Sequence, residues 1–285
     1  MKRLLVFLIA IAGLLAGARA AHAAASKPVR HAVAISPTPV LNTPDFKRVF
    51  SGAFRLDPCK GVRPIEFVAL TGTLFTIEGE QEKDGVTVYR VTSNDYPFPA
   101  KTGLFVDARF VEMVSGPLRE RPRSLPGLVE MQRRLLAAVG KPYVWGGNVK
   151  EGVPLLRKFY PQGDALAGVD CSGLLYQATD GFTPRNTLAL VGFGEAVPVA
   201  GLSAATIAQK LKPLDLLVWK GHVMMVLDAD SVIQSTMGCA GGGGVSVTPL
   251  EDALRRLMKS RQPVDRYPEG SAAARSFAVR RWLPR

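Results

Sequence analysis

The chain has 285 residues, of which 47% are hydrophobic and 21% charged, a balance typical of a folded globular protein and not of a disordered one. Its 36 lysines and arginines against 24 acidic residues give a formal charge of +12, which favours anionic partners such as nucleic acid, an anionic membrane surface or an acidic wall polymer. Three cysteines and three histidines are too few for a zinc site of the Cys/His type, so we expect no metal and no cofactor.

The first 23 residues have the pattern of a secretory signal peptide. Met1-Lys2-Arg3 is positively charged, and residues 4–15 are an apolar run. Two small-x-small cleavage patterns follow, Ala18-Arg19-Ala20 and Ala21-His22-Ala23. The run is shorter than the ~20 residues of a membrane-spanning helix, so a membrane anchor is the less favoured alternative. We therefore expect a periplasmic or secreted protein. Nucleic acid is then a poor candidate partner, and an anionic wall or membrane surface remains, unless the charge is simply a solvated surface.

Residues 24–44 predict a mobile linker, because they are rich in Ala, Pro, Ser and Thr and show no sustained period. Residues 45–117 predict a β-rich domain. Short β-branched or aromatic runs occupy 65–70, 73–77, 86–91 and 104–107, and turn residues separate them. Several short strands in so short a segment indicate a small β-barrel.

Residues 118–285 predict a second domain of the α+β class, reached through a Pro-flanked basic link at 119–126. The apolar periodicity predicts helices at 128–139, 171–180, 203–211 and 248–258. The last of these opens with a capping box formed by Thr248 and Glu251. Strands are predicted at 215–219, 222–227, 231–234 and 276–283.

Cys171 is the candidate nucleophile. An odd number of cysteines leaves at least one thiol unpaired, and Cys171 lies directly before the apolar run 174–176. This places it at the first turn of a buried helix, where the helix dipole and free backbone N–H groups favour the thiolate. Gly173 would let a substrate approach the backbone closely. The alternative is that Cys171 is a small inert core residue.

His222 is the candidate base by elimination. His22 lies in or at the edge of the signal peptide, and His31 lies in the predicted mobile linker. A cysteine nucleophile requires a base, normally an imidazole, and the imidazole requires a polar group that fixes its tautomer. Gln234 follows 12 residues later on the next predicted strand, which places it beside His222 in a hairpin. Each of the two residues could instead be an ordinary strand residue.

Five motifs occur in order along the second domain: Tyr143-Val144-Trp145-Gly146-Gly147, Asp170-Cys171-Ser172-Gly173, Pro184-Arg185-Asn186-Thr187, Lys212-Pro213-Leu214-Asp215-Leu216 and Gly221-His222-Val223. Over about residues 128–283 they resemble the NlpC/P60 family of cell-wall cysteine peptidases. The β-rich segment resembles the bacterial SH3-like domain that often precedes such a catalytic domain. The resemblance implies a papain-like α+β catalytic domain after a small SH3-like β-barrel. It also implies cleavage of the bond between γ-D-glutamate and the diamino acid in peptidoglycan stem peptides.

Carried over position by position, the resemblance makes Cys171 the nucleophile, His222 the general base and Gln234 the third polar residue, which is more often His in the family. Tyr143 would line the site behind the nucleophile. The remaining matched positions would contact the peptide stem: Trp145, Asp170, Ser172, Arg185 and Thr187. Arg185 would pair with a substrate carboxylate through two parallel hydrogen bonds, unless it is a surface arginine.

The chain departs from the family pattern in the long segment between Gly147 and Asp170, which we interpret as an inserted helix at the rim of the groove. Leu214 also stands where a glycine is usual. A disulfide between Cys59 and Cys239 would tie the two domains together. Two alternative functions remain open, a non-catalytic wall-binding protein and a thiol acyltransferase on the same scaffold.

Overall fold

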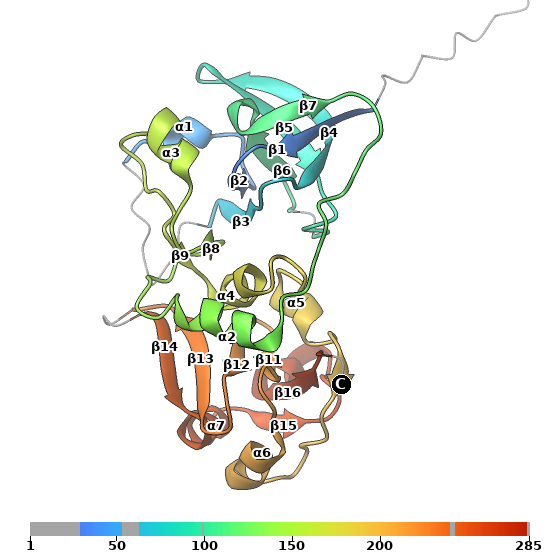
Figure 1. The fold of residues 1–285 in the computed structure, drawn as a ribbon, viewed down its shortest axis with the longest axis vertical. Helices are drawn as coiled ribbons and strands as arrows, with labels where there is room; N and C mark the ends of the chain where they lie inside the picture. The colour runs from blue at the N-terminus through green and yellow to red at the C-terminus, as the bar shows by residue number, and fades with distance from the viewer. Residues whose placement is uncertain (1–28, 53–62, 99, 240–242, 284–285) are drawn as a thin grey trace, which may run out of the picture.

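The computed structural model describes residues 29–52, 63–98, 100–239 and 243–283. The predicted signal peptide at 1–23 and the Cys59 half of the predicted disulfide therefore lie outside the described residues. The chain forms two β-sheet units stacked along the long axis of the molecule and joined by an extended segment on one side (Figure 1). None of the helices in the described ranges is long and apolar enough to cross a membrane.

The first unit is one antiparallel sheet in the order β3-β2-β6-β5-β4-β1-β7. Its elements are β1 (Arg30–Ala34), β2 (Thr38–Leu41), α1 (Phe46–Val49), β3 (Ile65–Ala69), β4 (Leu74–Lys83), β5 (Val86–Thr92), β6 (Leu104–Asp107), η1 (Ala108–Phe110) and β7 (Val111–Val114). The four predicted strands are confirmed as β3, β4, β5 and β6. Neighbouring residues of a strand face different cores, as Phe67 and Val68 of β3 do, because side chains alternate across a sheet.

The prediction that residues 24–44 form a mobile linker is wrong from residue 30 onward. β1 pairs with both β4 and β7, and β2 pairs with both β3 and β6. Ala32 and Ala34 point into the core and are buried. These small side chains carry little hydrophobic signal, so the alternation of β1 is hidden in the sequence. The same strand carries His31, whose ring lies 3.4 Å from the Thr76 hydroxyl and away from the site described below.

The second unit is built on a sheet in the order β10-β16-β11-β12-β13-β14, with β15 parallel to β16. Its elements are α2 (Leu128–Leu136), β8 (Asn148–Val149), α3 (Pro154–Phe159), β9 (Gly168–Val169), α4 (Cys171–Ala178), α5 (Thr187–Leu190), β10 (Glu195–Ala196), α6 (Ala204–Lys210), β11 (Leu216–Trp219), β12 (His222–Val226), β13 (Ser231–Thr236), β14 (Gly244–Pro249), α7 (Leu250–Met258), β15 (Gln262–Val264), η2 (Gly270–Arg275) and β16 (Ser276–Arg281). Helices α2 and α4 pack on one face, and α6 and α7 pack on the other.

The four helices and four strands predicted for this α+β unit are all present, as α2, α4, α6, α7, β11, β12, β13 and β16. The predicted capping box is not. Helix α7 begins after Pro249, without a side-chain cap, and the Thr248 hydroxyl is buried with no hydrogen-bond partner. Thr248 instead belongs to β14, where it pairs with Val232 of β13. The pairing of a strand with its neighbour therefore outweighs the local helix-start signal.

The inserted segment between Gly147 and Asp170 joins the two units. Helix α3 lies beside α1 of the first unit (Figure 1), and Leu156 packs in the same core as Phe46 and Val68. Tyr160, at the end of α3, donates a hydrogen bond of 2.6 Å to the buried carboxylate of Asp107. The prediction of a helix at the rim of the groove is thus corrected, because this helix packs on the first unit.

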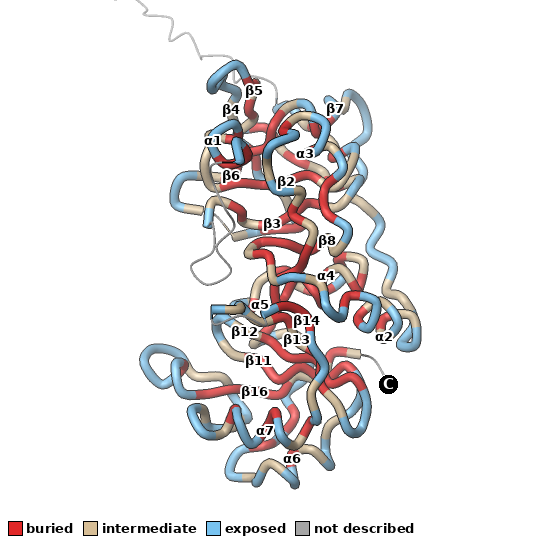
Figure 2. The backbone as a smooth tube through the Cα atoms, turned by 90° about the vertical axis from the view of Figure 1, so that its left-hand side faces the viewer, coloured by how far each residue is buried: buried red, intermediate tan, exposed pale blue. Residues whose placement is uncertain are grey.

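Asn148 of β8 forms a second polar contact between the units. Its side-chain amide donates to the backbone carbonyl of Val68 at 2.8 Å and accepts from the Val68 backbone N–H at 3.0 Å. Figure 2 shows buried residues in β3, β8 and α4, where the two units meet. The linking segment adds an ion pair of 2.6 Å between Arg123 and the buried Asp95. The first unit is therefore held directly against the elements that carry Cys171.

Candidate active site

Cys171 is the first residue of α4 and a free cysteine. Asp170 caps the helix, and its Oδ1 accepts the backbone N–H of Gly173 at 2.6 Å. The Cys171 side chain is 5% exposed, and it lines a cavity of about 370 Å³ between the two units. The predicted helix start is therefore confirmed. Gly173 has a different role from the predicted one, because a Cβ there would lie 2.0 Å from the Gly147 carbonyl oxygen.

His222 and Gln234 lie on neighbouring strands, as the hairpin argument predicts. Nε2 of His222 is 2.9 Å from Oε1 of Gln234. An amide oxygen can only accept, so Nε2 carries the proton and Nδ1 keeps its lone pair. The ring of Trp219 lies beside the imidazole, with 5.0 Å between the ring centroids.

The start of α4 and the start of β12 meet at the sulfur. The thiol of Cys171 accepts a hydrogen bond from the backbone N–H of Val223, the residue after His222. Cys171 and Val223 also belong to the same core. On the other side, the Ser235 hydroxyl of β13 donates to the Val169 carbonyl at 2.7 Å, which ties β13 to the strand preceding Cys171. Cysteine, histidine and glutamine therefore come from one helix start and two adjacent strands.

Burial shifts both Cys171 and His222 toward their neutral forms. Burial raises the pKa of the Cys171 thiol to about 12, and the Asp170 carboxylate adds to the rise. Hydrogen bonds from the Val223 and Ser172 backbone N–H groups oppose it only in part. Burial also lowers the pKa of His222, against the hydrogen bond to Gln234. The prediction that the helix start favours a thiolate is therefore corrected, because burial raises the pKa of the thiol by more than the backbone N–H groups lower it.

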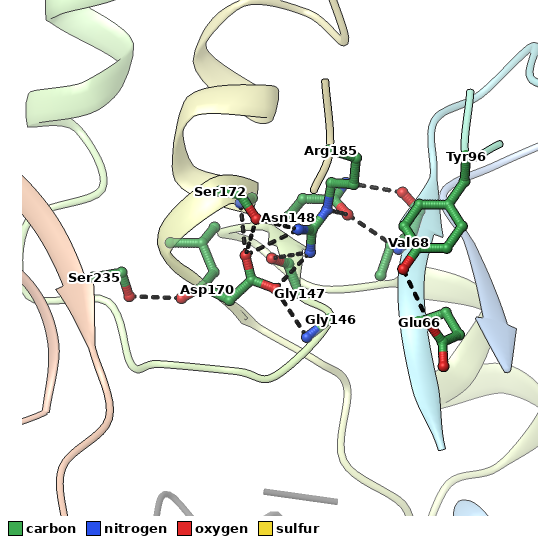
Figure 3. Close-up of polar contacts among 12 residues, drawn as sticks. Glu66, Val68, Tyr96, Gly146, Gly147, Asn148, Asp170, Ser172, Arg185 and Ser235 are labelled. Carbon is green, nitrogen blue, oxygen red and sulfur yellow. Dashed lines mark hydrogen bonds and ion pairs between the residues drawn. The ribbon is translucent and has the colours of Figure 1, made fainter. Parts of the chain in front are cut away.

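Asp170 and Arg185 form a buried ion pair at the start of α4 (Figure 3). Arg185 is 4% exposed. Its Nη1 donates to Asp170 Oδ1 and the Ser172 hydroxyl, its Nη2 donates to Asp170 Oδ2 and the Gly147 carbonyl, and its Nε donates to Asn148. A guanidinium has five N–H donors, and all five are used within the protein.

This changes the interpretation of three predicted substrate contacts. Arg185 has no donor left for a substrate carboxylate, so the predicted bidentate pairing is corrected. Asp170 accepts from Arg185, from Gly173 and from the Gly146 backbone N–H, and Ser172 is held between both charges. All three line the cavity, but their hydrogen bonds position the start of α4.

Tyr143, Trp145 and Thr187 lie on the wall of the same cavity. Burial raises the pKa of Tyr143, and the nearby carboxylate of Asp170 adds to the rise, so its phenol stays protonated. Thr187 begins α5, and its hydroxyl accepts the Gly221 backbone N–H at 3.0 Å, directly before His222. Seven of the nine sequence-predicted residues line this cavity. His222 follows the lining residue Gly221 in the chain, and Gln234 contacts His222.

The first unit contributes residues that sequence reasoning missed. Glu66, Tyr96, Asn42 and Arg63 line the cavity with Cys171. The Tyr96 hydroxyl donates to Glu66 at 3.0 Å, and the Asn42 amide donates to Glu66 at 2.7 Å. Tyr96 stands in a polar turn sequence and Glu66 in an ordinary strand pattern. Only the docking of the two units reveals them, so the sequence contained no local signal.

The described residues contain no group of three or more His, Cys, Asp or Glu side chains that could hold a metal ion. The predicted catalytic residues supply a thiol, an imidazole whose Nδ1 is unprotonated, and an amide that orients the imidazole. This chain of groups is what nucleophilic catalysis by cysteine requires.

No protein-family model and no curated protein matches this chain. Several solved structures of NlpC/P60 or NlpC proteins are similar to this chain. One is an NlpC/P60 family protein from Bacillus cereus, 17% identical with a TM-score of 0.35, matched over 90% of this chain and 64% of that one. Another is the P60 domain of an antigen from M. avium subspecies paratuberculosis, 20% identical with a TM-score of 0.32, over 54% of this chain and 93% of that one.

A third is NlpC1 from Trichomonas vaginalis, 14% identical with a TM-score of 0.35, over 90% of this chain and 70% of that one. This chain spans 64% of the length of the Bacillus cereus protein. Because these identities and TM-scores are low, the comparisons do not assign a function, and the function has to be argued from the geometry of the site.

Proposed function

We propose that this chain is a cysteine peptidase of the NlpC/P60 type that hydrolyses peptidoglycan stem peptides at the γ-D-glutamyl–diamino acid bond. The observation that carries the proposal is the 2.9 Å contact between His222 Nε2 and Gln234 Oε1. It leaves Nδ1 as the free base on the strand whose next backbone N–H contacts the Cys171 sulfur. The five ordered motifs of the sequence agree with it.

The neutral pair acts by general-base catalysis. Nδ1 of His222 takes the proton from Cys171 as Sγ attacks the amide carbonyl carbon, so the charge separation develops during the attack and not before it. The Cys171 backbone N–H, at the first position of α4, has no acceptor within the helix and is available to the oxyanion. Collapse of the tetrahedral intermediate then breaks the C–N bond, and the His222 imidazolium gives its proton to the leaving amine. Water, deprotonated by His222, then hydrolyses the thioester.

The cavity fits the acyl half of such a substrate. Its volume of about 370 Å³ is in the range of small-molecule sites, and the first unit supplies one of its walls. Glu66 presents a carboxylate to this space, held by Asn42 and Tyr96. A free N-terminal amine on the stem peptide would pair with Glu66, and a stem still attached to glycan would meet the wall of the first unit instead.

The remaining parts of the proposal concern the rest of the chain. We propose that the seven-stranded first unit is an SH3-like domain, that residues 1–23 are a signal peptide, and that the protein acts in the periplasm or outside the cell. Loss of residues 1–23 would remove Lys2, Arg3 and Arg19, and the remaining charge of +9, from 33 basic and 24 acidic residues, would favour an anionic wall or membrane surface.

Mass-spectrometric analysis of defined muropeptides tests the function. We expect wild-type protein to release the diamino acid side of a stem peptide that begins with L-Ala-γ-D-Glu and has a free N-terminal amine. Cys171→Ala should release nothing. Cys171→Ser is the matched variant, because it keeps the shape of the side chain but removes the sulfur. No cleavage of any stem by folded wild-type protein would favour the wall-binding alternative, and transfer of the acyl group to an added amine would favour the acyltransferase.

A further inference from the structure

The cavity beside Cys171 has two positively charged lining residues in the described part of the chain, Arg63 and Arg185. They differ in what they can still bind. The five N–H donors of Arg185 are all satisfied by Asp170, Ser172, Asn148 and Gly147. A carboxylate that enters the cavity must therefore find its cation in the first unit.

Arg63 is an exposed residue just before β3. Its guanidinium stacks on the Trp145 ring of the second unit, with Cζ 4.9 Å from the ring centroid. Stacking uses the face of the guanidinium and leaves its N–H donors free around the edge. Among the described residues, no carboxylate forms an ion pair with Arg63 and no side-chain hydrogen bond uses its guanidinium. The contact with Trp145 thus positions a cation whose edge is not hydrogen-bonded to any other described residue.

The charges around the cavity form a simple pattern. Asp170 and Arg185 neutralise each other in their buried ion pair. Glu66 and Arg63 remain, one negative and one positive, and Asn42 joins the Glu66 carboxylate to the backbone of Arg63. Its amide nitrogen donates both to the Arg63 carbonyl at 2.8 Å and to the Glu66 carboxylate at 2.7 Å. The cavity therefore matches a group that carries both a positive and a negative charge.

A γ-linked glutamyl residue supplies the negative charge. Because its side-chain carboxyl forms the scissile amide, its α-carboxylate stays free and enters the cavity with the carbonyl that Cys171 attacks. Burying a carboxylate without a cationic partner is costly. We infer that Arg63 binds this α-carboxylate and makes the site specific for a free carboxylate over an α-amide. The inference rests on the proposed function and adds a specificity residue from the first unit.

The test compares two stem peptides that differ only at the α-position of the γ-linked residue, carboxylate in one and carboxamide in the other. For wild-type protein we expect kcat/KM to favour the carboxylate by about 10- to 100-fold, the range of a charge-assisted hydrogen bond. Arg63→Ala should lose this preference, mainly through the carboxylate substrate. Arg63→Lys should keep part of it, because it retains the charge but not the planar fork.

Arg119→Ala is the matched control, since it removes the same charge from an exposed position in the linking segment, and it should keep the wild-type preference. Thermal denaturation checks that each variant is folded. If wild type cleaves neither peptide, the proposed function fails. If wild type cleaves them and Arg63→Ala retains the wild-type ratio, the function stands and the assignment of Arg63 is overturned.

Discussion

Replacing Arg185 by alanine tests whether this residue holds the site together or binds substrate. The substitution removes five hydrogen bonds and leaves the buried Asp170 without its cation. Breaking a buried ion pair from one side costs about 3–5 kcal/mol. Asp170 keeps the Gly146 and Gly173 N–H groups and the Ser172 hydroxyl, so we expect the lower end, about 3 kcal/mol.

For a chain of this size, 3 kcal/mol corresponds to a fall of roughly 6–12 °C in the midpoint of thermal unfolding. The assay is thermal denaturation followed by circular dichroism, together with steady-state kinetics. Arg133→Ala is the control, because its ion pair with Glu130 lies on the exposed face of α2, where such pairs contribute little. An Arg185→Ala protein with the midpoint of the control and only a raised KM would refute the reasoning. It would support the alternative that Arg185 binds a substrate carboxylate directly.

Three further outcomes follow from the same contacts. Wild-type kcat/KM should stay high below pH 6.5, the ordinary pKa of histidine, and fall only as pH drops through the lowered pKa of His222, since the neutral imidazole is the active form. Gln234→Glu places a negative charge beside this ring and should move that acid limb to higher pH; an unmoved limb in the pH–rate profile would argue against their contact. Asn148→Ala leaves the buried N–H and C=O of Val68 unpaired, at about 1–3 kcal/mol each. Limited proteolysis should then cut the linking segment faster, and an unchanged rate would mean that this contact does not hold the units together.

The second unit could be largely predicted from the sequence, because its signals are local. Helix α6 begins where Ser203 accepts the Thr206 backbone N–H, as an N-cap residue does. His222 and Gln234 meet because the turn between β12 and β13 is short. Cys171 was placed correctly at a helix start, since an apolar run follows it directly.

What the sequence could not show depends on burial and on docking between units. The high pKa of Cys171 comes from how deeply α4 is packed, which no local pattern encodes. The full use of the Arg185 donors requires Asn148 and Asp170, which precede it by 37 and 15 positions, to converge on it. Glu66 lines the cavity because the first unit packs against the second, and the inserted helix α3 takes part in that packing.

The central claim is that Cys171 is a nucleophile activated by His222. The most direct test is covalent labelling by a stem-peptide analogue that carries a chloromethyl ketone in place of the scissile amide, followed by intact-mass measurement over time. Because the resting thiol is neutral, we expect one adduct per chain on Cys171, formed at least about 100-fold more slowly in His222→Ala. Labelling of folded His222→Ala at the wild-type rate, or no adduct at Cys171 in folded wild-type protein, would contradict the account.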